Sequence, residues 1–197
     1  MIKVECNGGV HEFSSETTVG KVIKKVYGKK SGAIAALVND EEKDLSHLLL
    51  NDCKVELIDA SSKEGAYIMK HSCAHLLAQA VTELFPNAKP TIGPPIDEGF
   101  YYDFYMDPID ENDLRKIEKL MKKIIKQNIP IQREEHNNET LREMFSDNPF
   151  KIEIMDEKIG EEVGSSAYRQ GKFVDLCRGP HVESTGKLKW FKLTNTS

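Results

Sequence analysis

Two pairs of acid–base and metal-binding side chains, far apart in the chain, constrain its fold more than any other feature. His71 and His75 lie four residues apart in the run HSCAHLLAQAVTELF, which is typical of a helix, so both imidazoles point to one face. Cys177 and His181 have the same spacing, but the Gly-Pro dipeptide between them excludes a helix. If the two segments meet in space, they form either a tetrahedral metal site or a metal-free hydrolytic pocket.

The helical pattern around the histidines predicts where they point. On a helical wheel, the apolar residues of this run fall opposite His71 and His75 and form a buried stripe. Two solvent-facing histidines on an ordinary amphipathic helix would give the same pattern. The second pair, Cys177 and His181, is what favours a functional site.

Composition limits the classes of protein to which the chain can belong. Its 197 residues, 39% of them hydrophobic, can bury a core and are enough for two small domains. Four cysteines without an apolar N-terminal segment favour a reduced, cytoplasmic protein over a disulfide scaffold. No apolar run approaches the roughly 18 residues of a membrane span, so no membrane partner is expected. The net charge of -5 argues against nonspecific coating of nucleic acid but allows a local basic face.

The first sixty residues predict a small domain of their own. The segments 2–6 and 10–13 flank the sequence Asn-Gly-Gly, a hairpin signal, and a helix with Thr17 or Thr18 as N-cap follows and ends at Gly28. Residues 33–38 and 54–58 are strand candidates, and 39–44 is expected to be a charged turn. The order β-β-α-β-β predicts a β-grasp, ubiquitin-like domain over 1–61.

A polar joint at 61–65 predicts a second domain over 65–197. Its pattern indicates an α+β fold, in which helices pack on an antiparallel sheet. Residues 150–155 are ambiguous between helix and strand. The expected elements are an aromatic strand with Phe100, Tyr102 and Phe104 on one face, a helix over 110–127, a hairpin of 166–169 with 172–177, and a last strand over 187–193.

The helix expected over 110–127 carries an unusually basic outer face. Six cationic side chains accompany a lone Glu118 there. Such faces are usually only solvated, and nucleic-acid contact is the alternative. The cationic residues are Arg115, Lys116, Lys119, Lys122, Lys123 and Lys126.

Residue chemistry leaves the central constellation open between two kinds of site. Four His and Cys ligands would close a tetrahedral zinc site, and a catalytic zinc would need one of them to withdraw. Without metal, imidazoles can orient and deprotonate a water molecule. Asp175 is expected on the same strand face as Cys177, so that a carboxylate flanks the thiol and helps bind a substrate amine or hydroxyl.

Three long motifs carry a family resemblance. The runs HSCAHLLAQA, IGPPIDEGFYYDF and VDLCRGPHVESTG, with FKLTNTS at the end, closely resemble the N-terminal region of bacterial threonyl-tRNA synthetases. The resemblance covers essentially the whole chain and implies a β-grasp (TGS) domain followed by an editing (tRNA-SAD) domain. It implies post-transfer editing, the hydrolysis of serine wrongly attached to threonine tRNA. Serine lacks one methyl group of threonine, and a single binding pocket distinguishes two substrates that differ by such a group by only about 10- to 200-fold. A second site that hydrolyses the wrong product is therefore needed.

The resemblance also implies roles for individual residues. His71 is the better candidate for activating water, Lys151 helps to orient water or neutralise developing charge, and Tyr102 and Asp175 hold the seryl group and its amine. The site is expected to need no metal, with zinc as the alternative because alanine-specific relatives bind zinc at these positions. The residues expected to be catalytic are His71, His75, Lys151, Cys177 and His181. If zinc is present, all of them except Lys151 are also expected to be its ligands.

The motifs of aminoacylation and anticodon binding are missing from this sequence. The chain is therefore expected neither to bind ATP nor to charge tRNA, and its expected partners are threonine tRNA and the remainder of a synthetase chain. Two other functions stay open. One is a tRNA- or partner-binding module with an idle pocket, and the other is a zinc-dependent hydrolase of a smaller substrate.

Overall fold

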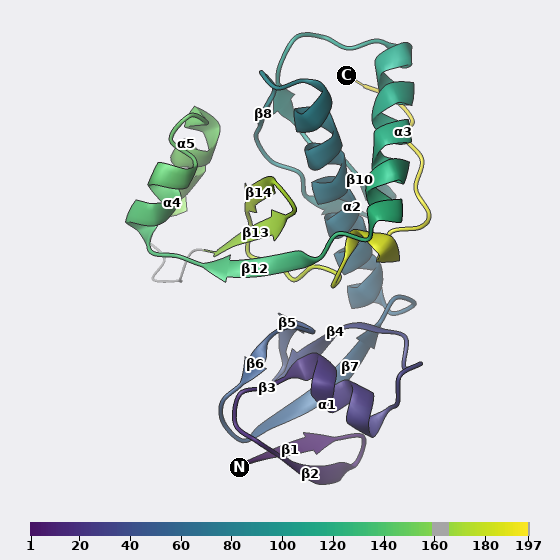
Figure 1. The fold of residues 1–197 in the computed structure, drawn as a ribbon, viewed down its shortest axis with the longest axis vertical. Helices are drawn as coiled ribbons and strands as arrows, with labels where there is room; N and C mark the ends of the chain where they lie inside the picture. Colours follow the sequence, from purple (N-terminus) through teal and green to yellow (C-terminus); the bar gives the residue numbers. More distant parts are fainter. Residues whose placement is uncertain (159–165, 197) are drawn as a thin grey trace. The chain divides into compact units, whose positions relative to one another are not determined.

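The structure is a computed structural model that describes residues 1–158 and 166–196. Contacts within the chain divide it into two compact units (Figure 1). The first contains residues 1–69 and 179–183, and the second contains 70–178 and the segment from 184 onward. The long helix α2 (Lys63–Leu84) begins in the first unit and continues in the second.

The first unit is built on a five-stranded sheet with one helix. The strand order is β2-β1-β7-β4-β5, in which β1 pairs in parallel with β7 and the other neighbours are antiparallel. The elements are β1 (Ile2–Cys6), β2 (Gly9–Phe13), α1 (Val19–Val26), β4 (Ala33–Val38), β5 (Glu41–Asp44) and β7 (Cys53–Asp59), with a separate pair of β3 (Thr17–Thr18) and β6 (Leu48–Leu49).

Turn and cap chemistry explains most of these boundaries. The first hairpin is confirmed, with Asn7 and Gly8 at positive φ in its turn. The Thr18 side chain accepts the N–H of Lys21 and caps α1. The charged turn expected over 39–44 is partly wrong. Only Asn39 and Asp40 turn, both at positive φ, and the residues after them form β5. The β-grasp assignment stays a prediction.

The second unit combines helices with short antiparallel strands, as the α+β prediction requires. Its largest sheet has the order β12-β13-β14, and two strand pairs, β10 with β9 and β11 with β8, lie outside it. Beyond α2, the elements are β8 (Lys89–Pro90), β9 (Pro95–Ile96), β10 (Gly99–Phe100), β11 (Phe104–Tyr105), α3 (Glu111–Gln127), β12 (Ile131–Glu135), α4 (Asn138–Met144), α5 (Pro149–Lys158), β13 (Ser166–Gln170), β14 (Phe173–Leu176) and a 3-10 turn η1 (Thr185–Lys187).

Two predicted elements differ in the structure, and one ambiguous segment is resolved. The aromatic strand is interrupted, because only 99–100 and 104–105 pair, although Tyr102 and its two neighbouring aromatic rings share one hydrophobic cluster as predicted. The ambiguous segment 150–155 lies in α5. The last strand is wrong: 185–187 form η1 and the described residues after it are irregular, because side-chain hydrogen bonds to α3 replace strand pairing.

Helix α2 is more buried than its amphipathic pattern predicts. Its apolar residues Leu76 and Ala80 are fully buried as expected, yet His75 on the opposite face is only 4% exposed. The apolar stripe is thus buried as predicted, but the histidines do not face solvent as a pair, which excludes the alternative of an ordinary amphipathic surface helix. Both sides of α2 pack within the protein, which turns its polar side into a buried site.

Candidate active site

Helix α2 and the end of strand β14 bring three of the predicted side chains together. Cys177 Sγ lies 3.3 Å from His71 Nε2, and the rings of His71 and His75 meet edge to face with centroids 5.3 Å apart. One turn of helix separates the two histidines, so the predicted i, i+4 spacing accounts for their contact. The thiol comes from a residue just past the strand, where the backbone N–H of Cys177 donates to Ser166 O.

A buried charged cluster adjoins these side chains. Lys151 Nζ lies 2.5 Å from Asp175 Oδ1, and the Tyr102 hydroxyl donates to Asp175 Oδ2 at 2.5 Å. His75 Nε2 lies 3.6 Å from the same Oδ2 atom. Lys151 and Asp175 are only 3% and 1% exposed. The carboxylate is thus the common partner of a lysine, a phenol and an imidazole in a site without bulk water.

Burial and neighbouring charges set the protonation states of this cluster. Burial lowers the pKa of His75 to about 3, because removing the imidazolium from water outweighs the attraction of Asp175. Burial is the largest single influence on the pKa of Asp175 and raises it, but the charges of Lys151 and His75 and the hydrogen bonds from Lys151 and Tyr102 together lower it by more, so the net shift is downward. Burial, followed by the Asp175 carboxylate, raises the pKa of Tyr102 well above its usual value. At neutral pH the site holds a neutral imidazole, a carboxylate and a protonated phenol.

A backbone carbonyl that the sequence did not single out, together with Tyr102, holds Lys151 in place. Its ammonium donates to Thr91 O at 2.9 Å, and it lies 3.1 Å from the Tyr102 hydroxyl. Asn148, at the start of α5, donates through Nδ2 to Pro90 O at 2.8 Å and so ties this helix to the same segment. The Asn-Pro dipeptide before α5 is a helix-start signal that could have indicated this position.

Gly93 permits the close approach of Tyr102. A Cβ atom at Gly93 would lie 2.2 Å from Tyr102 Cδ2, a distance at which one of the two must move. Packing against Tyr102, and not a positive φ, is therefore what requires glycine at this position. The sequence signals only a Gly-Pro turn at this point and does not identify what the glycine contacts.

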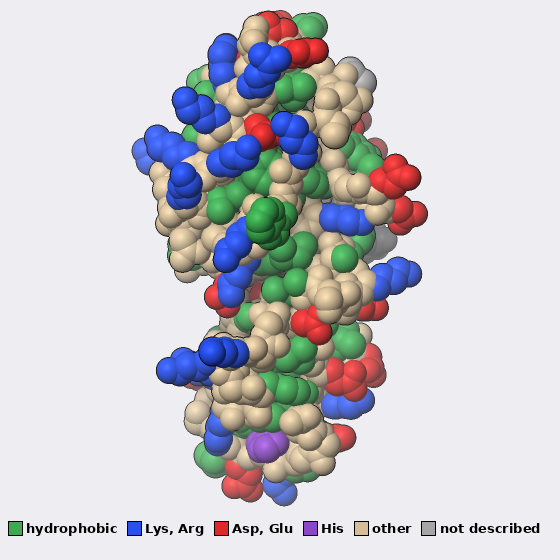
Figure 2. Space-filling model, turned by 90° about the vertical axis from the view of Figure 1, so that its right-hand side faces the viewer, with side chains coloured by type: hydrophobic (Ala, Val, Ile, Leu, Met, Phe, Trp, Pro, Cys, Tyr) green, Lys and Arg blue, Asp and Glu red, His purple; other side chains and the backbone are tan. Residues whose placement is uncertain are grey.

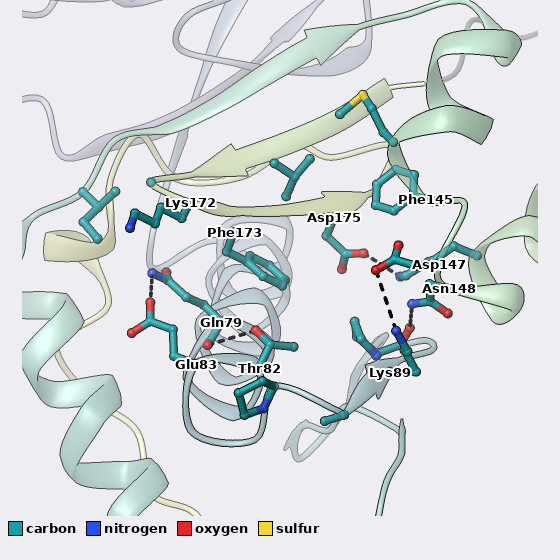
Figure 3. A pocket seen from close by; sticks show the side chains of 18 of the residues that line it. Gln79, Thr82, Glu83, Lys89, Phe145, Asp147, Asn148, Lys172, Phe173 and Asp175 are labelled. Atoms are coloured by element: carbon teal, nitrogen blue, oxygen red, sulfur yellow. Dashed lines mark hydrogen bonds and ion pairs between the residues drawn. The ribbon is translucent and has the colours of Figure 1, made fainter.

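A groove of about 890 Å³ reaches the charged cluster within the second unit (Figure 3). Asp175 and Phe173 project into it from β14, and Gln79 lines it from α2. Lys151 lines it as well, whereas His71 and Cys177 do not. The groove therefore borders the charged cluster, whereas His71 and Cys177 lie outside its lining.

The structure brings six of the seven predicted site residues into one neighbourhood of the second unit. The seventh, His181, lies in the segment 179–183, which groups with the first unit. It is buried, and its backbone N–H donates to Asp44 Oδ1 at 2.8 Å. The six that lie together are His71, His75, Tyr102, Lys151, Asp175 and Cys177.

The His/Cys group fits zinc by donor type. The ligand atoms of His71, His75 and Cys177 lie within 4.8 Å of one another. Zinc bonds of about 2.0–2.3 Å in a tetrahedron would hold two such atoms roughly 3.3–3.8 Å apart, so only a small contraction is needed. A zinc ion held by these residues would act as a Lewis acid on water. Cys73 on the same helix is not part of this group, and burial raises the pKa of its thiol to about 12.

Comparison with known proteins identifies the relatives of this chain. The family described as threonyl and alanyl tRNA synthetase second additional domain matches residues 166–197. The threonine–tRNA ligase of Thermotoga maritima is 46% identical over 201 residues, covering 100% of this chain and 31% of that protein. That of Thermoplasma volcanium is 50% identical over 170 residues, or 86% of this chain and 24% of that protein.

The similarity is thus high, although the chain spans only about a third or less of the length of these relatives. Among the described residues, no helix is both long and apolar enough to cross a membrane. The three sequence motifs, the match to the second additional domain and the similarity over the whole chain all indicate the same family. The chain belongs with the threonyl-tRNA synthetases and corresponds to an N-terminal part of them.

Proposed function

We propose that this chain edits mischarged tRNA by hydrolysing the ester between serine and threonine tRNA. The observation that carries the proposal is the buried Asp175 carboxylate, shared by Lys151 and Tyr102 beside the His71–Cys177 pair. A buried carboxylate can receive the ammonium of an aminoacyl ester, and neutral imidazole can accept a proton from water. The relatives' names support the tRNA substrate, and the reaction would take place in the cytoplasm.

In the proposed reaction, water adds to the seryl carbonyl carbon and the bond from this carbon to the ribose oxygen breaks. His71 takes the proton of the attacking water and returns it to the ribose oxygen, which leaves as a hydroxyl. The products are serine and uncharged tRNA, so atoms and charge balance. His75, neutral because of burial, orients the water, and Lys151 stabilises negative charge that develops on the carbonyl oxygen.

Selectivity follows from the size and polarity of the pocket. Asp175 would bind the amino group that serine and threonine share, so discrimination must come from exclusion of the extra methyl of threonine. Tyr102 is the candidate for this role, because its ring is packed against Gly93 and cannot move away from the pocket without losing that contact. His181, four residues after Cys177, is proposed to line the aminoacyl or adenosine end of the substrate.

The decisive experiment measures release of serine from serine-charged threonine tRNA. We expect His71→Ala to reduce the rate by about 10²–10⁴-fold, the usual contribution of a general base. His11→Ala in the first unit is the matched control and should leave the rate unchanged. Equal rates for the wild-type chain and His71→Ala would refute the role of His71. Threonine-charged tRNA should stay intact with every variant.

The contact between His71 and Cys177 also fits a thiol nucleophile with its base, and a second variant separates the two mechanisms. If water attacks directly, Cys177→Ala should retain a large part of the activity. If the thiol attacks, Cys177→Ala should lose it, and hydroxylamine should trap a seryl thioester in the wild-type chain. We expect the first outcome, because Cys177 would serve to line the pocket.

A zinc-dependent hydrolase of a smaller substrate is the competing function, which the similarity to threonine–tRNA ligases does not favour. Metal analysis of the purified chain decides this point. Stoichiometric zinc that is lost in His75→Ala would favour the metal-dependent reaction. Activity that survives extensive chelation, in a protein without bound zinc, would favour the metal-free reaction.

A further inference from the structure

One face of the second unit gathers exposed Lys and Arg side chains (Figure 2). Its lysines come from α3, from the end of η1 and from the segment that follows η1, which runs beside α3 in Figure 1. We call this surface the lysine face. It consists of Lys119, Lys122, Lys123, Lys126, Lys187, Lys189, Lys192 and Trp190, all of them exposed.

The C-terminal segment is attached to α3 on both sides of Trp190. Before it, the Thr185 hydroxyl donates to Ile124 O at 2.9 Å. After it, the backbone N–H of Leu193 donates to Glu118 Oε2 at 3.2 Å. These bonds hold the segment along the helix, so Trp190 is presented beside the lysines of α3 and is not on a detached tail.

Positive charge on the lysine face exceeds the negative charge that could neutralise it. Glu118 is the acidic residue here, and it is shared by Lys122 and Lys192. Four lysines of this face form no recorded ion pair within the part of the chain that the structure describes. They are Lys119, Lys123, Lys126 and Lys189. Neighbouring cations repel one another, and a bound polyanion would relieve that repulsion.

The exposure of Trp190 adds a second, independent observation. Its side chain is 91% exposed, which is unusual for the largest apolar residue type. The cores of protein–protein interfaces are depleted in lysine, so a tryptophan surrounded by lysines fits a protein partner poorly. Aromatic rings with flanking cations are instead the surfaces on which nucleic-acid bases stack while lysines contact phosphates.

We propose that the lysine face binds an RNA strand, with phosphates on its lysines and an unpaired base stacked on Trp190. The RNA would be the tRNA whose aminoacyl end occupies the active site, so the identity of the ligand rests on the proposed function. The lysine face itself contains none of the residues assigned to hydrolysis. Its role is to add affinity for the body of the substrate.

Fluorescence offers a direct test, because Trp190 is the only tryptophan in the chain. Saturating uncharged tRNA should quench its emission, as base stacking requires. Trp190→Ala should weaken binding of labelled tRNA by about 5- to 150-fold, the range for loss of one stacked base. Trp190→Phe should restore much of the affinity. Emission that saturating tRNA leaves unchanged would overturn the proposal.

A triple variant tests the phosphate contacts. Replacing Lys119, Lys123 and Lys126 with Gln should weaken tRNA binding at least tenfold and reduce the slope of log K against log salt by about 2 to 3. The matched control replaces three exposed lysines of the first unit with Gln and removes the same charge. These are Lys24, Lys29 and Lys30. Equal losses of affinity in the two triple variants would overturn the proposal.

A small substrate separates this proposal from the editing function. The lysine-face triple variant should raise the KM for serine-charged tRNA but leave the hydrolysis of a seryl ester of adenosine unchanged. If the wild-type chain hydrolyses neither substrate yet binds tRNA through Trp190, the editing proposal fails and the lysine face stands. A shift in Trp190 emission with protein concentration alone, accompanied by a dimer in sedimentation, would assign this face to a second copy and overturn the proposal.

Discussion

The two units bury different kinds of side chain in their interiors. The hydrophobic cluster of the first unit consists of apolar residues such as Val4, Val22 and Ile23. The second unit also has apolar clusters, but it buries the lysine and carboxylate of Lys151 and Asp175 among them. This hydrophobic cluster is explained by the hydrophobic effect alone, although the first unit also buries Asp44 and His181 outside it.

A buried ion pair is weak support for stability, because the cost of removing two charges from water can exceed their attraction. The second unit therefore holds its charged cluster at an energetic disadvantage compared with an apolar core of the same shape. We infer that the cluster is retained for chemistry. The four predictions that follow test this contrast between an interior built for stability and one built for a reaction.

The largest expected effect is in the charged cluster. Asp175→Ala leaves the Lys151 ammonium buried and unpaired, which should cost about 3–5 kcal/mol of unfolding free energy. Amide hydrogen exchange of the β14 peptide measures this loss locally. The double variant Lys151→Met, Asp175→Leu should recover the stability or exceed it but remain inactive. Asp97→Ala, at an exposed position, is the control. If Asp175→Ala lost no more stability than this control, the contrast between the two interiors would be contradicted.

Truncation in the first unit should affect stability without affecting chemistry. Ile23→Ala removes a side chain that is 2% exposed and should lower the unfolding free energy by about 2–5 kcal/mol, as buried isoleucine truncations do. Hydrogen exchange of the β4 peptide should report the loss. Hydrolysis of a seryl ester of adenosine should continue at the wild-type rate. A reduced rate would show that the first interior also serves the reaction.

Gly93→Ala should disturb the packing of the site itself. The new Cβ would displace the Tyr102 ring, at a cost of about 1–3 kcal/mol for an overpacked core. Because Tyr102 donates to Asp175, hydrolysis should fall as well. Gly99→Ala is the matched control, since nothing lies within 4 Å of a Cβ there. Identical stability and activity in the two variants would exclude Gly93 as a packing constraint.

The smallest effect concerns acid stability at the edge of α3. Hydrogen bonds from Lys122, and then from Lys192 and Leu193, lower the pKa of Glu118 from 4.5 to about 2. The pKa of Glu118 is lower in the folded chain than in the unfolded one. The ionised carboxylate therefore stabilises the folded chain above about pH 4.5, and this stabilisation is lost as the pH falls through about 2. The lysines are exposed, which limits the contribution to about 1 kcal/mol.

Glu118→Gln provides the measurement for this last prediction. Its unfolding free energy, followed by circular dichroism, should vary less between pH 4.5 and 2 than that of the wild-type chain. Glu98→Gln, at an exposed loop position, is the control and should keep the wild-type pH dependence. Parallel curves for Glu118→Gln and the wild type would show that Glu118 does not anchor the C-terminal segment.

Local patterns predicted elements wherever a short-range interaction decides the backbone. Asn7 and Gly8 predicted the first hairpin, Thr18 the start of α1, and the apolar period with Asp110 the helix α3. These features depend on turn geometry, capping and periodicity within a few residues. The two His/Cys pairs were predicted from their spacing, whereas the roles of Lys151 and Tyr102 came only from the family resemblance.

Other outcomes depended on contacts that no local pattern encodes. Glu118 was expected on a solvated face and is buried by the C-terminal segment, whose expected strand does not form. The segment around Lys151 could not be assigned from its pattern, because its packed face buries a lysine beside Met155 and the apolar period is therefore weak. Tertiary packing decided these positions.

By itself, the sequence predicted the α+β class and the family resemblance, and it proposed the residues of the candidate site. Only the tertiary structure decided that His75 is buried and neutral, that Asp175 joins Lys151 to Tyr102, and that Gly93 makes room for the Tyr102 ring. The physical reason is that protonation and packing depend on desolvation and on atoms within a few ångströms. Those neighbours come from segments that are distant in the chain.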